Sequence, residues 1–321
     1  MALDPKAGIH PILKKAADLH VSDVHCMVGQ SPIFRMNGVL EEQKDFKAYT
    51  EEILKKHLNE MLTKAQHEEF YQTRELDMSL VLPAGGRFRL NLFWEKGNPA
   101  LAARYIPLEI PSLDDLLAPE ASYDFVKRDM GLVLVTGPTG CGKSTMLASM
   151  LEDINLNDKK HIITLEDPVE FMYTPKQSLI AQRELGSDFL SFEEGLKHIL
   201  RQDPDVILVG EMRNLETISA AITLAETGHL VFATLHTNSA PETIDRIVNV
   251  FPPNQQQQIR LQLAMTLAGV ISQILIPKTD GALIAAHEVL VNNIAIANLI
   301  RESKTNQIQN VLYSSPDEHM N

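Results

Sequence analysis

The chain has 321 residues, of which 44% are hydrophobic and 22% are charged. This length is enough for two ordinary domains, and the composition is that of a soluble globular protein rather than a disordered one. The formal net charge is −13. A surface of that sign repels polyanions, so no nucleic acid is expected as the main partner.

Signals for export, membrane insertion and disulfide bonding are not visible. The longest apolar runs, such as 132–135 and 206–209, are far shorter than a membrane span. The start of the chain lacks a basic region followed by an apolar one, so no secretory signal is expected. Cys26 and Cys141 are the two cysteines, too few for a disulfide framework or a four-cysteine zinc site. We therefore expect a cytoplasmic protein.

Residues 1–106 have the pattern of a small α+β domain. A helical stretch at 10–20 comes first, and a second helix begins after Thr50, which is a suitable N-cap. Asn37-Gly38 predicts a two-residue hairpin turn, because both positions need a positive φ. The expected strands of an antiparallel sheet are 24–28, 33–36, 39–42, 76–82, 87–94 and 100–106.

Three prolines, Pro107, Pro111 and Pro119, bracket a short acidic stretch and predict a linker or hinge over 107–119. In residues 120–321, continuous apolar runs then alternate with helical patterns. This alternation predicts an α/β domain with a mostly parallel sheet and helices on both faces. The expected strands are 132–137, 161–168, 205–211 and 229–236, and the expected helices are 143–155, 191–201 and 215–227.

The polar residues that end these four strands predict one common site, because ligands of parallel sheets bind beyond the carboxyl ends of the strands. Residues 137–144 read GPTGCGKS, which matches the phosphate-binding pattern G-x-x-x-x-G-K-[ST] between a strand and a helix. Backbone N–H groups of such a loop hold phosphates, the lysine neutralises their charge and the hydroxyl binds Mg²⁺. The expected ATP contacts are Gly137, Pro138, Thr139, Gly140, Cys141, Gly142, Lys143, Ser144 and Thr145.

Carboxylates follow two of the other strands. Glu211 ends an apolar strand, as a Walker B acid does, and is expected at Mg²⁺ or its water shell together with Ser144. Glu166, Asp167 and Glu170 cluster at the end of another strand. Three carboxylates near a triphosphate repel it unless they bind metal or position the attacking water. A solvated acidic turn is the alternative.

His229 and His236 bound the last of the four strands. Seven residues apart in an extended strand, they point to opposite faces, which argues against a two-histidine metal site. The open alternatives are a phosphate-sensing role for one of them and a purely structural role. Cys141, inside the phosphate loop, is interpreted as a small residue tolerated between glycines rather than as a redox group.

In order along the chain, GPTGCGKST, ITLEDPVEF, ILVGEMRNLET and TGHLVFATLHTNSA resemble the Walker A, Asp box, Walker B and His box of type II/IV secretion ATPases. Within that superfamily, SDVHCMVGQSPIFRMNG, RFRLNLF and ANLIRESKTNQI are similar to PilT-like retraction ATPases of type IV pili. The resemblance covers nearly the whole chain. It implies a PAS-like N-terminal domain, a RecA-like ATPase domain and a homohexamer with ATP between subunits.

The resemblance also implies roles for individual residues. Glu166 becomes the catalytic glutamate, Glu211 the Walker B acid and His229 the His-box residue that senses nucleotide. Arg89 and Arg104 match arginines that reach the nucleotide of a neighbouring subunit. The implied function is Mg²⁺-dependent ATP hydrolysis that drives pilus retraction and twitching motility. The implied partners are a platform protein, at the cytoplasmic face of the inner membrane, and a paralogous pilus ATPase.

Three positions depart from the retraction pattern, although none belongs to the expected ATP site. Ala297 replaces an arginine, Asn214 an aspartate and Asn306 a histidine. The alternatives are an accessory PilU-like ATPase, a pilus-assembly or type II secretion ATPase, a RecA-like nucleic-acid motor and a nucleotide-gated module without turnover. The net charge disfavours the nucleic-acid motor, and the two cysteines disfavour the tetracysteine zinc insert usual in assembly ATPases.

Overall fold

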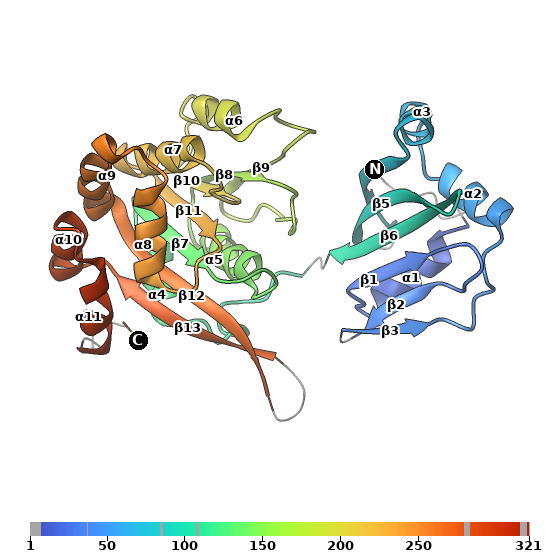
Figure 1. The fold of residues 1–321 in the computed structure, drawn as a ribbon, viewed down its shortest axis with the longest axis horizontal. Coiled ribbons are helices and arrows are strands. Elements are labelled where there is room, and N and C mark those ends of the chain that lie inside the picture. Colours follow the sequence, from blue (N-terminus) through green and yellow to red (C-terminus); the bar gives the residue numbers. More distant parts are fainter. Residues whose placement is uncertain are drawn as a thin grey trace. The chain divides into compact units, whose positions relative to one another are not determined.

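The computed structural model describes residues 8–36, 38–83, 86–106, 109–278, 283–314 and 320. The chain forms two compact units, Met1–Glu109 and Ile110–Asn321, and each is described by itself (Figure 1). The boundary between them falls within the stretch that the sequence assigns to a linker. Asn37 of the expected hairpin turn and Pro107 of the expected linker lie outside the described residues.

The first unit is built on a six-stranded antiparallel sheet with the order β3-β2-β1-β6-β5-β4. Met36 pairs with Val39 across the expected hairpin, and Thr50 caps its helix by accepting a hydrogen bond from the backbone N–H of Ile53. The elements are α1 (His10–Asp18), β1 (Asp23–Cys26), β2 (Ile33–Met36), β3 (Val39–Glu42), α2 (Glu51–Asn59), α3 (Lys64–Thr73), β4 (Glu75–Val81), β5 (Arg87–Glu95) and β6 (Asn98–Ile106).

One face of this sheet carries the core of the first unit. Alternate residues of β5, including Phe88, Leu90 and Leu92, are buried in one cluster with Leu13 of α1 and Leu54 of α2. Because successive side chains of a strand point to opposite faces, the residues between them lie on the face that the helices of this unit leave uncovered.

The second unit contains a seven-stranded sheet with the order β13-β12-β7-β11-β10-β8-β9, parallel except for the edge strand β13. Its elements are α4 (Ala121–Val126), β7 (Gly131–Thr136), α5 (Lys143–Asn157), β8 (His161–Glu166), β9 (Leu179–Glu184), α6 (Phe192–Ile199), β10 (Val206–Val209), α7 (Leu215–Glu226), β11 (Leu230–Leu235), α8 (Ala240–Asn249), α9 (Pro253–Thr266), β12 (Leu267–Pro277), β13 (Leu283–Val291), α10 (Ile294–Arg301), the short 3₁₀ helix η1 (Thr305–Gln307) and α11 (Ile308–Ser314).

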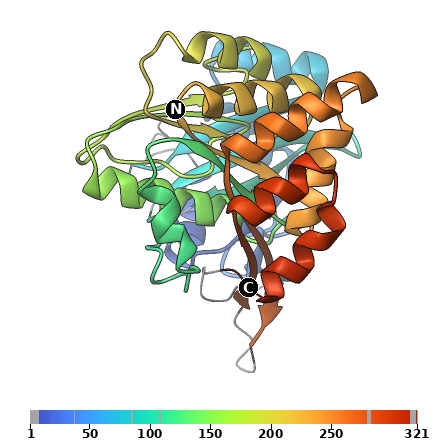
Figure 2. The ribbon, with the colours of Figure 1, turned by 90° about the vertical axis from the view of Figure 1, so that its left-hand side faces the viewer.

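Both faces of this sheet are covered by helices. In β7, Leu132 and Leu134 belong to the core beneath the helices α6 to α11, whereas Val133 and Val135 pack with α4 and α5. The turned view places the orange and red helices on one side of the sheet and the green helices on the other (Figure 2). Strands that are buried on both faces have continuous apolar runs, which explains why these strands were recognisable in the sequence.

The four strands expected in this unit are β7, β8, β10 and β11, and the three expected helices are α5, α6 and α7. No sequence pattern predicted α4, β9, β12, β13 or the helices after β11. Leu113, within the expected linker, is buried in the core of the second unit. Among the described residues, no helix is both long and apolar enough to cross a bilayer.

Candidate nucleotide site

The topology of the second unit brings the expected site segments to one edge of its sheet. Strands β7, β11, β10 and β8 are consecutive neighbours, and they run parallel. The phosphate loop follows β7, His236 follows β11, Glu211 comes shortly after β10, and Glu166 is the last residue of β8. The P-loop motif and these three side chains therefore belong to four adjacent carboxyl ends.

The phosphate loop, residues 137–142, depends on glycine for two different reasons. A Cβ atom at Gly137 would lie 2.2 Å from the backbone oxygen of Gln273, so any side chain there would clash with β12. Gly142 has φ +89° and is the N-cap of α5, a left-handed conformation that only glycine adopts without strain. The residues at the tip of the loop, 138–140, are exposed. The loop is therefore held at both ends and open at its tip.

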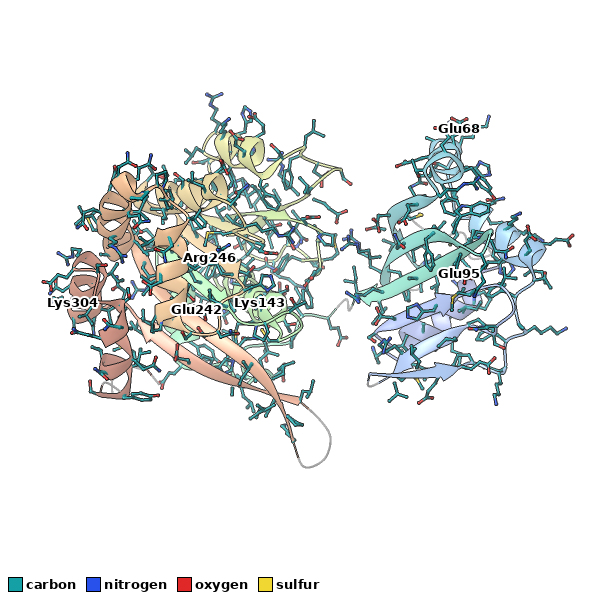
Figure 3. The ribbon with its side chains drawn as sticks, in the orientation of Figure 1. Glu68, Glu95, Lys143, Glu242, Arg246 and Lys304 are labelled. Atoms are coloured by element: carbon teal, nitrogen blue, oxygen red, sulfur yellow. The ribbon has the colours of Figure 1, made fainter. Side chains whose placement is uncertain are left out.

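Lys143 is the first residue of α5 (Figure 3) and is only 8% exposed. Its Nζ donates hydrogen bonds to the backbone oxygens of Gly137, at 2.8 Å, and Pro138, at 3.0 Å. Ser144 and Thr145 follow on the first turn of α5 and are half-buried. The ammonium group thus lies against the loop that is expected to hold phosphate.

His236 connects the lysine to the acid after β10. Its Nδ1 lies 3.5 Å from Nζ of Lys143, and its Nε2 lies 3.3 Å from Oε1 of Glu211. The other carboxylate oxygen of Glu211 forms an ion pair with Arg213 at 2.8 Å. Partial burial alone would raise the pKa of Glu211, but the hydrogen bond and charge of Arg213, together with His236, lower it on balance. Glu211 is therefore held as a carboxylate.

The structure places the two histidines that bound β11 in different surroundings. His229 precedes β11, at the amino end of the sheet, where its Nδ1 lies 3.0 Å from the backbone oxygen of Leu224. His236 is the member of the pair that reaches Lys143 and Glu211. The resemblance implies the nucleotide-sensing role for His229, and that role stays a prediction.

Glu166 is 8% exposed at the end of β8. Burial raises the pKa of its carboxyl group, while hydrogen bonds from Thr164 (Oγ1 to Oε1, 2.6 Å) and Gln182 (Nε2 to Oε1, 3.4 Å) oppose that rise. A buried carboxylate with a raised pKa is a stronger base than a solvated one. Asp167 and Glu170, the other two acids of this cluster, are exposed.

The loop after Glu166 is fixed by β9. Gln182 accepts a hydrogen bond from the backbone N–H of Tyr173 and donates one to the backbone oxygen of Phe171. Glu184 accepts one from the backbone N–H of Val169. Gln182 has no signal in the sequence, because β9 is an edge strand of half-buried and exposed residues and lacks the apolar run that marks its neighbours.

Arg89 and Arg104 lie in the first unit, directly opposite each other on β5 and β6. Both are exposed on the face that the helices of this unit leave uncovered. Nε of Arg104 forms an ion pair with Oδ1 of Asp23 at 2.9 Å. Two like charges in directly opposed positions destabilise a sheet, and the ion pair with Asp23 offsets part of this repulsion.

Two of the three departures from the retraction pattern have a structural explanation. Asn214 is the N-cap of α7 and accepts a hydrogen bond from the backbone N–H of Thr217. Asparagine and aspartate cap helices about equally well. Ala297 is 7% exposed on α10 and packs in the core, where a longer charged side chain would have to be buried. Asn306 is exposed, and nothing in the structure explains it.

The fold and the site together define a P-loop nucleotide-binding protein, because a GxxxxGKS loop joins a buried parallel strand to a helix and acids end the neighbouring strands. The sequence matches the family described as type II/IV secretion system protein over residues 7–314. The chain therefore belongs to that family.

Three similar proteins place the chain within the family. It is 42% identical over 311 residues to the type IV pilus retraction ATPase PilT of Pseudomonas aeruginosa, covering 95% of this chain and 88% of that protein. It is 50% identical over 248 residues to a twitching motility protein of Neisseria gonorrhoeae, covering 77% of this chain and 66% of that protein. The crystal structure of the pilus retraction motor PilT with bound ADP is 43% identical, with a TM-score of 0.89 over 97% of this chain and 93% of that one.

Proposed function

We propose that this protein is a homohexameric motor ATPase that drives type IV pilus retraction, and hence twitching motility. The single observation that carries the proposal is the convergence of the P-loop motif, Glu211, His236 and Glu166 on four adjacent strand ends. The similarity to proteins named for pilus retraction and twitching motility supports pilus retraction as the process that ATP hydrolysis drives.

Binding of ATP rests on the loop at 137–142 and on Lys143. The loop supplies N–H groups and the positive end of the α5 dipole, and Lys143 turns from the carbonyls of Gly137 and Pro138 toward the phosphates. The donor set also fits Mg²⁺, since Ser144 and Glu211 offer the oxygen ligands that this ion prefers beside phosphate and water. When bound, Mg²⁺ would neutralise charge that develops on the transferred phosphoryl group.

Glu166 accepts the proton of the attacking water. Its burial and raised pKa favour that role, and Thr164 and Gln182 fix the carboxylate in one orientation. Glu170, exposed on the same loop, lacks this enclosure. His236 contacts both Lys143 and Glu211. A movement of Lys143 toward the phosphates would therefore shift His236 and, through it, Glu211 after β10.

Arg89 and Arg104 complete the site of a neighbouring subunit. The second unit offers Lys143 as the cation of its loop, whereas the transition state spreads charge over three oxygens, and an added arginine is typically worth ~10³–10⁵ in rate. The test mixes Arg89→Ala/Arg104→Ala protein with Lys143→Ala protein. Activity should partly return in mixed rings, whereas inactive mixed hexamers, or a double arginine variant with normal turnover, would refute the role.

Whether the protein retracts or assembles pili is tested by deleting its gene in cells that carry type IV pili. A retraction ATPase draws pili in against a platform protein at the cytoplasmic face of the inner membrane, so its loss should leave cells with excess surface pili and no twitching. An assembly ATPase predicts bald cells instead. An accessory, PilU-like role predicts that a second retraction ATPase maintains partial twitching after the deletion.

A further inference from the structure

A buried glutamine of β12 contacts the phosphate loop. Gln273 is only 3% exposed, and its Nε2 donates a hydrogen bond of 2.6 Å to the backbone oxygen of Cys141. Cys141 precedes Gly142, the N-cap of α5. The bond therefore joins a strand that carries no expected site residue to the part of the loop from which α5 begins.

β12 also braces the beginning of the loop. Ser272 pairs with Thr136 in the sheet, and their side-chain oxygens lie 2.9 Å apart. The backbone oxygen of Gln273 occupies the space where a side chain at Gly137 would be. Contacts at Thr136, Gly137 and Cys141 thus hold the entry and the end of the loop against the same two residues of β12.

The side chain of Gln273 forms one hydrogen bond among the described residues, the bond to Cys141. Its Oε1 is buried and has no hydrogen-bond partner among the described residues, so the bond to Cys141 fixes the amide. Burying an amide is unfavourable unless it is hydrogen-bonded. An apolar side chain would fill the same space at lower cost, which indicates that the donor itself matters.

Peptide geometry explains what the bond achieves. The carbonyl of Cys141 and the N–H of Gly142 belong to one planar trans peptide, so they point in opposite directions. The hydrogen bond draws the carbonyl toward β12 and thereby turns the Gly142 N–H away from it. Gly142 tolerates either orientation of this peptide, because glycine has few steric limits on φ. Without an anchor, the carbonyl oxygen could turn toward the phosphates and repel them.

We propose that Gln273 is a positioning residue that holds the peptide between Cys141 and Gly142 in the phosphate-binding orientation. This inference rests on the proposed ATP site and deepens it. It predicts a role in recognising the β-phosphate, the group that separates ADP from AMP, rather than a general role in holding the second unit together.

The test compares Gln273→Met with Gln256→Met. Methionine has nearly the volume of glutamine and cannot donate a hydrogen bond. Gln256 is the matched control, because its Nε2 also donates to a backbone oxygen, that of Phe251 at 3.1 Å, away from the loop. The affinities of the purified proteins for ADP and AMP, with Mg²⁺, are measured by calorimetry, and unfolding temperatures are recorded without nucleotide.

The expected result is that Gln273→Met reduces the preference for ADP over AMP by roughly five- to tenfold, the equivalent of one hydrogen bond. Gln256→Met should keep the wild-type preference. An unchanged preference in Gln273→Met, or equal weakening of ADP and AMP, would overturn the inference. If the wild-type protein itself does not prefer ADP to AMP, the proposed phosphate site is wrong, and this inference fails with it.

Discussion

Replacing Glu166 by glutamine is expected to slow turnover and to stabilise the second unit at the same time. The side chain is 8% exposed, and burial raises the pKa of its carboxyl group against the hydrogen bonds from Thr164 and Gln182. Glutamine keeps the shape, and its amide oxygen accepts the hydrogen bond from Thr164. It carries no charge to bury and cannot take a proton from water.

The kinetic effect follows from the loss of a positioned base, which is worth ~10²–10⁴ in rate. The effect on stability follows from the raised pKa of Glu166. A carboxyl group that holds its proton more tightly in the folded chain makes the free energy of unfolding rise as the pH falls from neutral toward its ordinary pKa. The glutamine variant should lose that part of the pH dependence and should be more stable than wild type at pH 8.

The assay measures phosphate release, ADP binding and urea unfolding at pH 6 and pH 8. Glu170→Gln is the control, since Glu170 is an exposed acid of the same loop. It should leave turnover and ADP binding unchanged. Because the charge of Glu170 adds to the raised pKa of Glu166, this variant should weaken the pH dependence of stability without removing it. Normal turnover in Glu166→Gln would remove Glu166 from the mechanism. If Glu166→Gln is less stable than wild type at pH 8, burial of the Glu166 carboxylate does not destabilise the folded chain, and the reasoning is refuted.

Three further predictions concern other parts of the molecule. His236→Ala should lower turnover by about tenfold or more, the usual worth of a hydrogen bond to a charged group, whereas His229→Ala should not; a larger loss in His229→Ala than in His236→Ala would contradict this and support the role that the resemblance implies for His229. Phe232→Ala removes a fully buried ring from β11 and should lower the free energy of unfolding by ~3–5 kcal/mol in urea titrations, and a loss below 1 kcal/mol would contradict the packing. Single- or double-stranded DNA should leave ATP turnover unchanged at physiological salt, because the chain carries a net charge of −13, and several-fold stimulation would favour a nucleic-acid motor.

Much of the second unit could be predicted because its central strands are buried on both faces. The runs that became β7, β8, β10 and β11 are continuous and apolar, and the P-loop motif fixed where the first of them ends. Parallel pairing then placed the other carboxyl ends beside it. Glu166 and Glu211 could be proposed for the same reason, since each lies at the carboxyl end of a strand of this kind.

The remaining parts depend on contacts between distant segments. Gln182 lies on an edge strand without an apolar pattern, and Gln273 reaches Cys141 from a strand far along the chain. Neither has a local signal, because an isolated glutamine is ordinary on any surface. His236 follows the carboxyl end of β11 and His229 precedes the strand, so the rule for parallel sheets already favoured His236, whereas the resemblance pointed to His229.

The most direct test of the account is ATP turnover by the purified protein and by Lys143→Ala. Lys143 lies against the loop carbonyls, and its loss removes the cation that neutralises the phosphates. The wild-type protein should release phosphate steadily and the variant almost none, with the same circular dichroism spectrum for both. Equal release by the two proteins would contradict the assignment of ATP hydrolysis to this site.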